Sequence, residues 1–173
     1  MIKKQDKVLQ ILQLAIKMEQ DGKKFYHRVS RESQHKLGQT LLERLAAEED
    51  IHRQQFEKIY EAISEKEAWP KTDFHPNKGQ VIRTVFAQAA KETHPSTATE
   101  QDAIKVAIDM ENQSYELYKT QSKSATSNGE KTFFEALAGE ERGHQIALND
   151  YLEYLENPAD WNRMKEHHSL DGG

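Results

Sequence analysis

Apolar residues recur every three or four positions through most of the chain, a spacing that places them on one face of a helix. The pattern predicts four long helices, over about residues 5–31, 37–64, 99–122 and 131–156. The segments 30–38 and 122–130 interrupt it and are expected to be turns. Thr99 and Asp102 have the spacing of a capping box at the start of the third helix, and Asn157-Pro158 is expected to end the fourth.

The connection between the second and third helices is much longer than the other two. It has roughly 35 residues, with prolines at positions 70, 76 and 95, and its segment 81–91, VIRTVFAQAAK, is expected to form a short helix. A connection of this length can cross a whole bundle, whereas the short connections join antiparallel neighbours. We therefore expect an all-α protein in which two helical hairpins and a crossover form one four-helix bundle, residues 1–157. The tail, residues 158–173, is expected to pack on the bundle through Trp161.

The two predicted hairpins resemble each other in sequence. AIKMEQDGKKFY, from Ala15, aligns with AIDMENQSYELY, from Ala107, and LERLAAEEDIH, from Leu42, aligns with FEALAGEERGH, from Phe134. Both alignments have the same offset of 92 positions and need no gap. A constant offset across two helices indicates an internal duplication of one hairpin.

Ionisable side chains occupy the apolar faces of all four predicted helices. Glu19 shares a face with Leu12 and Ile16, because residues three, four and seven positions apart lie on one side of a helix. The same spacing places five further residues on apolar faces: Glu49, His52, Glu111, Glu141 and His144. Buried carboxylates are costly unless a cation compensates them, and lysines and arginines do not recur at matching places on these faces. Two divalent ions would supply the charge, and carboxylates with one imidazole per metal suit iron or manganese.

These residues also have other interpretations. A single Glu-x-x-His segment is commonly solvated surface, but two copies at one offset, each with a partner glutamate among apolar residues, favour a dimetal site. Within each Glu-Glu pair we select Glu49 and Glu141, which align with apolar residues one level earlier in the helix; Glu48 and Glu140 are then expected to be solvated. The remaining histidines are expected at the surface: His27, His35, His75, His94, His167 and His168. Gly139 and Gly143 either leave room near the metals or allow close helix contact.

Composition excludes several classes of function. The chain has no cysteine, which rules out disulfides, thiolate metal sites and cysteine nucleophiles within these 173 residues. The net charge of −5 offers no basic patch for nucleic acid or anionic membrane. No apolar run has membrane-spanning length and no signal peptide is evident, so we expect a cytoplasmic location.

The motifs AIKMEQDGKKFY, EEDIH, AIDMENQSYELY and EERGH resemble those of the rubrerythrin branch of the ferritin-like superfamily, over nearly the whole chain. The resemblance implies a ferritin-like four-helix bundle with a di-iron site. It also implies that Tyr26 and Tyr118 act as hydrogen-bonding and proton-donating groups beside the metals. Two features depart from the family pattern. The rubredoxin iron needs cysteines that are missing here, and Ser114 replaces an extra glutamate, with Gly22 at the corresponding position of the first helix.

The resemblance predicts a non-haem di-iron oxidoreductase that reduces hydrogen peroxide, or dioxygen, in protection against oxidative stress. Electrons would come from an external donor such as a rubredoxin-like protein, and we expect a homodimer. Manganese or zinc remains open as a substitute for iron. A ferroxidase that handles iron and a bundle that binds metal without turnover are the alternatives.

Overall fold

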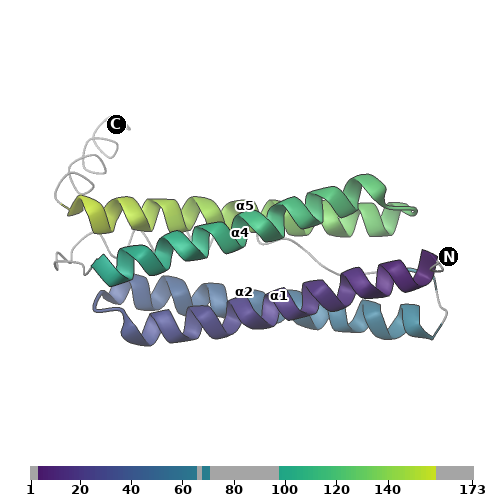
Figure 1. Ribbon diagram of the computed structural model, residues 1–173, viewed down its shortest axis with the longest axis horizontal. Helices are drawn as coiled ribbons and strands as arrows, with labels where there is room; N and C mark the ends of the chain where they lie inside the picture. Colours follow the sequence, from purple (N-terminus) through teal and green to yellow (C-terminus); the bar gives the residue numbers. More distant parts are fainter. Residues whose placement is uncertain (1–3, 66–67, 71–97, 159–173) are drawn as a thin grey trace, which may run out of the picture.

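The computed structural model describes residues 4–65, 68–70 and 98–158, and Figure 1 shows four long helices there in two hairpins. The first hairpin contains α1 (Lys4–Glu32) and α2 (Lys36–Ser64), and the second contains α4 (Ala98–Ser124) and α5 (Asn128–Glu156). This arrangement confirms the prediction of an all-α bundle made of two helical hairpins. The expected short helix at 81–91 and the tail with Trp161 lie outside the described residues.

Both turns within the hairpins are shorter than the sequence pattern predicted. Residues 33–35 join α1 to α2, and residues 125–127 join α4 to α5. The polar residues on either side continue the helices although they carry no apolar periodicity, because backbone hydrogen bonds do not depend on it.

The helix caps also differ from the prediction. The capping pair lies at the start of α5, where Ser127 Oγ accepts a hydrogen bond from the Glu130 backbone N–H at 3.2 Å. Glu130 Oε2 in turn accepts one from the Thr126 backbone N–H at 2.8 Å. Thr99 was the wrong choice for a cap, since α4 already includes Ala98.

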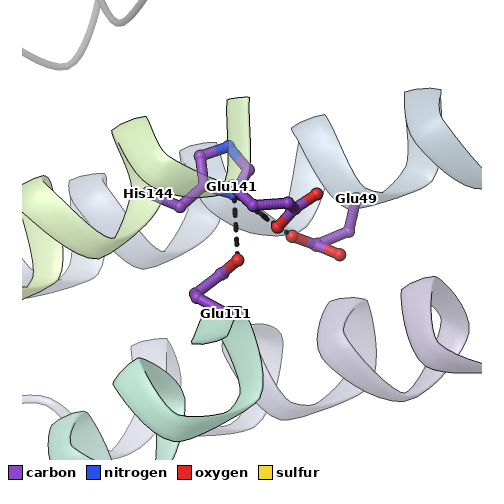
Figure 2. Close-up of side chains that lie close together, drawn as sticks. All are labelled: Glu49, Glu111, Glu141 and His144. Carbon is purple, nitrogen blue, oxygen red and sulfur yellow. Dashed lines mark ion pairs between the residues drawn. The ribbon is translucent and has the colours of Figure 1, made fainter. Parts of the chain in front are cut away.

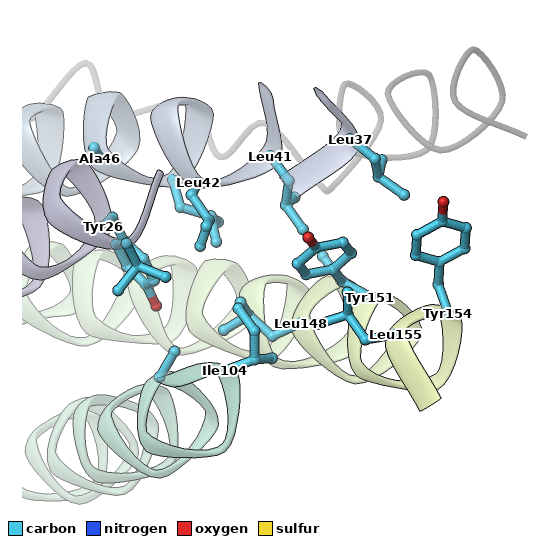
Figure 3. Packing of buried hydrophobic residues seen from close by; sticks show 14 residues of the cluster. Tyr26, Leu37, Leu41, Leu42, Ala46, Ile104, Leu148, Tyr151, Tyr154 and Leu155 are labelled. Carbon is cyan, nitrogen blue, oxygen red and sulfur yellow. The ribbon is translucent and has the colours of Figure 1, made fainter. Parts of the chain in front are cut away.

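Two apolar clusters fill the two ends of the bundle. Figure 3 shows one of them, in which Leu41 and Leu42 of α2 pack with Ile104 of α4 and Leu148 of α5. The other cluster is rich in aromatic rings at its centre: Phe56, Tyr118, Phe133 and Phe134. Between the two clusters, near the middle of every helix, lies a layer of buried glutamates and histidines. The polar layer therefore lies between the two apolar clusters.

The described helices are not of the membrane-spanning type. None of the four described helices combines the length with the apolar composition that crossing a bilayer requires.

Candidate metal centre

The polar layer contains all six residues that the sequence predicts as metal ligands. Each helix contributes from close to its midpoint: Glu19 from α1, Glu49 and His52 from α2, Glu111 from α4, Glu141 and His144 from α5. Every one of the six is at most 5% exposed. Apolar residues before and after each ligand lie on the same face of the helix. When that face packs into the core, the charged side chains are buried as well.

The two imidazole rings lie face to face at the centre of the layer, with centroids 5.8 Å apart and planes inclined by 14°. His52 Nδ1 is 3.4 Å from Glu19 Oε2 and 3.4 Å from Glu141 Oε1. His144 Nδ1 is 3.4 Å from Glu49 Oε1 and 3.4 Å from Glu111 Oε2, an arrangement visible in Figure 2. Both rings therefore direct the same nitrogen at the carboxylates.

The donor atoms form three overlapping groups, within each of which one ligand atom per residue lies within 4.8 Å of the others. Two contain only predicted ligands: Glu19, Glu49 and His52 in one, and Glu49, Glu111, Glu141 and His144 in the other. The third joins His144 to Glu48 and Glu140. Glu141 also approaches both histidine Nδ1 atoms, at 3.4 and 3.7 Å. We call Glu49 and Glu141 the central glutamates. A donor set of this composition, with the central glutamates between two histidines, is the one that di-iron bundles use.

Several buried polar atoms in this layer have no hydrogen-bond partner among the described residues. They are Glu19 Oε2, Glu49 Oε1, both carboxylate oxygens of Glu141, and His144 Nδ1. Nor does any described lysine or arginine form an ion pair with the four carboxylates, which contact only the histidines in this way. Unsatisfied buried polar atoms are rare in folded proteins, so their concentration here fits a site for cations.

The electrostatics of the protein alone show how much charge a metal would have to balance. Burial raises the pKa of Glu49 and Glu141 well above the usual value, and the negative charges of Glu19 and Glu111 raise it further. Burial also opposes ionisation of Glu111, but the charge of His144 outweighs it and lowers the pKa to about 2. Burial alone would lower the pKa of both histidines. The surrounding carboxylates outweigh this effect, so the pKa of each histidine is well above its usual value. Without metal, protons on the central glutamates and histidines therefore balance the charge.

Glu48 and Glu140 are not solvated, contrary to the prediction. They are 6% and 8% exposed, and each faces the histidine of the opposite hairpin: Glu48 Oε2 lies 3.0 Å from His144 Nε2, and Glu140 Oε2 lies 3.7 Å from His52 Nε2. Burial raises the pKa of Glu48, but the hydrogen bonds from His144 and Arg44 outweigh it and lower the pKa to about 2. A carboxylate at Nε2 holds the proton on that nitrogen and leaves Nδ1 available to a metal.

The structure also places the two predicted tyrosines against ligand carboxylates, each across the hairpin boundary. The Tyr26 hydroxyl of α1 donates a short hydrogen bond to Glu111 Oε1 of α4, and the Tyr118 hydroxyl of α4 donates one to Glu19 Oε1 of α1. Burial and the neighbouring carboxylate charges raise the pKa of both phenols well above its usual value. Both tyrosines therefore keep their protons and remain hydrogen-bond donors at neutral pH.

Gly22 has a role that the sequence did not reveal. A Cβ atom at this position would lie 3.0 Å from Glu49 Oε2 and 3.3 Å from Glu49 Cδ. The glycine therefore makes room for a central glutamate, while Ser114, at the equivalent position of α4, is partly buried. The site has no carboxylate at either position.

His35 is buried, contrary to the prediction of a surface position. It is 2% exposed, its ring packs edge-on against Tyr154 with centroids 5.8 Å apart, and its Nε2 is 4.0 Å from Glu100 Oε2. The Tyr151 hydroxyl donates to Glu100 Oε1 at 2.7 Å. The start of α4 and the end of α5 cover the turn between α1 and α2, so this group joins the two hairpins at one end of the bundle. His27 is 37% exposed at its side chain, as predicted, and the other four histidines lie outside the described residues.

Comparison with known proteins identifies a relationship over most of the chain. A family model described as Rubrerythrin matches residues 10–152, and matches again over residues 102–169. No curated protein and no solved structure matches the chain. The matched range contains all six candidate ligands and both tyrosines.

Proposed function

We propose, from the premise that this chain belongs to the rubrerythrin family, that its buried layer binds two iron ions and reduces hydrogen peroxide. The observation that carries the proposal is the paired donor set, in which two histidine Nδ1 atoms face four buried carboxylates, and three of these have oxygens without a hydrogen-bond partner among the described residues. Two divalent ions would balance four carboxylates and leave both imidazoles neutral.

The metal pair would supply the electrons and the protein would supply the protons. Two ferrous ions bound here would together give the two electrons that convert hydrogen peroxide to two water molecules, a reduction that also consumes two protons. Tyr26 and Tyr118 would deliver these protons, and the support for this role is that each is a buried neutral phenol hydrogen-bonded to a ligand carboxylate. General-acid assistance of this kind is worth about 10²-fold or more in rate.

The remaining parts of the proposal concern partners and location. These 173 residues contain no cysteine to hold a rubredoxin-type iron, and the electron donor that we propose is a rubredoxin-like protein. A homodimer and a cytoplasmic location likewise stay predictions from the sequence.

A ferroxidase is the second candidate, and one observation favours it. Ser114 and Gly22 occupy the positions where an extra glutamate would allow an iron ion to change ligands. Without a carboxylate at either position, oxidation of iron for storage or release is the alternative use of the same centre.

Metal content tests the site first. Protein purified from iron-replete cells should contain two iron ions per chain, and Glu49→Ala or Glu141→Ala should abolish tight binding, because each removes a ligand shared by both ion positions. Glu43→Ala, an exposed glutamate on α2, is the control and should leave the stoichiometry unchanged. If iron-, manganese- and zinc-replete preparations all contain almost no metal, the proposed dimetal site is wrong. If the protein instead binds zinc tightly and shows no redox activity, only a metal-binding bundle remains.

Stopped-flow absorbance then separates the two activities. Anaerobic ferrous protein should be oxidised faster by stoichiometric hydrogen peroxide than by equimolar dioxygen. If dioxygen is faster, and excess ferrous iron is turned over to ferric mineral or released ferric ions, the ferroxidase function replaces the peroxidase.

A further inference from the structure

A row of aromatic rings leads from the metal centre towards the surface at one end of the bundle. Tyr118, whose hydroxyl donates to the ligand Glu19, has its ring centroid 6.1 Å from that of Phe134. The Phe134 centroid lies 5.8 Å from that of Trp69, and Trp69 is only partly buried. Both distances are those of rings in contact, so the three side chains form a continuous row.

A second line of rings joins the same tryptophan and tyrosine. Trp69 lies 5.8 Å from Phe133, measured between ring centroids. Phe56 completes the line, 5.4 Å from Phe133 and 5.4 Å from Tyr118. Electron tunnelling slows steeply with distance, and close packing keeps each of these steps short. Only tyrosine and tryptophan give up an electron readily, so the phenylalanines serve as the packed medium between Tyr118 and Trp69.

The duplicate of Tyr118 has different surroundings. Tyr26 lies 92 positions earlier and donates to the ligand Glu111 as Tyr118 donates to Glu19. The three phenylalanines, however, are leucines at the equivalent positions, in the aliphatic cluster of Figure 3: Leu41, Leu42 and Leu148. Among the described residues, packed rings therefore join only Tyr118 to a partly exposed indole.

The Trp69 indole lacks the hydrogen bond that a buried N–H group usually makes. Its Nε1 atom is buried and has no hydrogen-bond partner among the described residues. Without an acceptor, the indole keeps its proton when it loses an electron, so it can pass electrons without moving a proton. The phenol of Tyr118 differs, because Glu19 Oε1 accepts its hydrogen bond and offers its proton a way out.

We propose that Tyr118 and Trp69 form a one-electron route between the metal centre and solvent. The route operates when a single ferrous ion supplies only one of the two electrons that hydrogen peroxide requires. Tyr118 then gives the second electron together with its proton, and one more proton comes from solvent. Hydrogen peroxide becomes two water molecules, and Tyr118 becomes a neutral radical. Trp69 passes an electron from a soluble reductant to this radical, which also takes back a proton from Glu19. The inference rests on the proposed metal centre and its reaction with peroxide.

The use of such a route follows from counting electrons. A single electron converts hydrogen peroxide to hydroxide and a hydroxyl radical, which attacks almost any side chain. Tyr118 is hydrogen-bonded to a ligand carboxylate, so the second electron is available within the polar layer itself. The Tyr118 side chain is fully buried, so its radical is protected from other molecules until an electron arrives through Trp69.

Electron paramagnetic resonance tests which tyrosine is oxidised. The full-length protein receives ferrous iron well below one ion per chain in the absence of oxygen, is mixed with stoichiometric hydrogen peroxide, and is frozen. The wild type should show a tyrosyl radical, and Tyr118→Phe should lose it. Tyr26→Phe should still form a radical with the wild-type line shape. A signal that persists unchanged in Tyr118→Phe would overturn the inference.

The decay of the radical tests Trp69 separately. With ascorbate as the soluble reductant, the signal should decay severalfold more slowly in Trp69→Phe, which keeps an aromatic ring in place but is not oxidised. Trp69→Tyr restores an oxidisable ring and should recover most of the rate. Trp161→Phe changes the position that the offset of 92 makes equivalent, and as the control it should leave the decay unchanged. Equal decay in the wild type and Trp69→Phe would overturn the role of Trp69.

Protein that holds zinc in place of iron separates the route from the reaction of the metal centre. A photogenerated ruthenium(III) complex is a one-electron oxidant too large to reach the fully buried Tyr118, but it can meet the exposed part of Trp69. It should generate a tyrosyl radical that is missing in Tyr118→Phe and reduced in Trp69→Phe. If this radical forms but iron with peroxide yields none, the proposed reaction with peroxide is wrong and the route stands. If neither oxidant produces it, the route is wrong.

Discussion

Replacing Gly22 by alanine should separate fold stability from metal affinity. The new Cβ would lie 3.0 Å from Glu49 Oε2 and 3.3 Å from Glu49 Cδ, closer than about nine in ten Cβ contacts in folded proteins. Ordinary contact distances begin near 3.4 Å, so the carboxylate must retreat by about 0.4 Å. Metal–ligand distances tolerate only about 0.2 Å, so this shift exceeds what a bound ion permits.

The two effects of the substitution have opposite signs. Glycine inside a helix is about 1 kcal/mol less favourable than alanine, so metal-free Gly22→Ala should gain up to about 1 kcal/mol in its free energy of unfolding. Its affinity for metal should fall by about tenfold or more, because a ligand shared by both ion positions is displaced. Urea denaturation of the metal-free protein measures the first effect, and competition with a chromophoric chelator measures the second.

Gly143→Ala is the matched control, because its Cβ would meet none of the described atoms within 4 Å. It should gain a similar amount of stability and keep the wild-type affinity. If Gly22→Ala binds metal as tightly as the wild type, Glu49 has room to move and the account of Gly22 as a spacer is wrong. If the variant instead loses more than about 1 kcal/mol of metal-free stability, the crowding acts on the fold and not on the ligand alone.

Three further outcomes are expected. Gly38→Ala should destabilise the fold by about 2–4 kcal/mol in urea denaturation, because its Cβ would overlap the Tyr151 hydroxyl and break the hydrogen bond to Glu100; a neutral result would contradict the packing described at this end. The raised pKa of the central glutamates and of both histidines leaves protons on these groups that a metal must displace. Near neutrality, metal affinity should therefore rise with pH by up to about tenfold per pH unit for each proton released. Calorimetry in buffers of different ionisation enthalpy counts these protons, and a count of zero would refute the charge balance. Tyr26→Phe should slow oxidation of the ferrous protein by peroxide, because Glu111 loses its phenol donor; an unchanged stopped-flow rate would remove the proton-donor role.

The apolar periodicity and the constant offset were sufficient to predict much of this structure. Glu19 and Glu111 could be placed in the core because apolar residues before and after each of them lie on the same helix face. When that face is buried, the glutamate is buried with it. The offset of 92 then assigned equal depth to the two histidines. These predictions succeed because a helix fixes the face of every residue once its buried side is known.

Contacts between the hairpins could not be predicted in the same way. Glu48 lies at the edge of the apolar face of α2, and whether such an edge is solvated depends on where α5 packs. His35 is buried only because the ends of α4 and α5 close over a polar turn. The recurrence of the whole Glu-Glu pair at the same offset was a signal that both members are buried, but helical spacing alone favoured one of them.

The hydrogen bonds that cross between the hairpins are reciprocal, and this has a consequence for assembly. Tyr26 contacts Glu111 as Tyr118 contacts Glu19, and Glu48 faces His144 as Glu140 faces His52. Two identical hairpins would meet through the same self-complementary surface, so a homodimer of a single hairpin contains every element of this centre. Joining the two copies in one chain removes the requirement that they stay identical. Arg44 in one half and Ala136 in the other record that freedom, which a symmetric dimer of one gene product does not have.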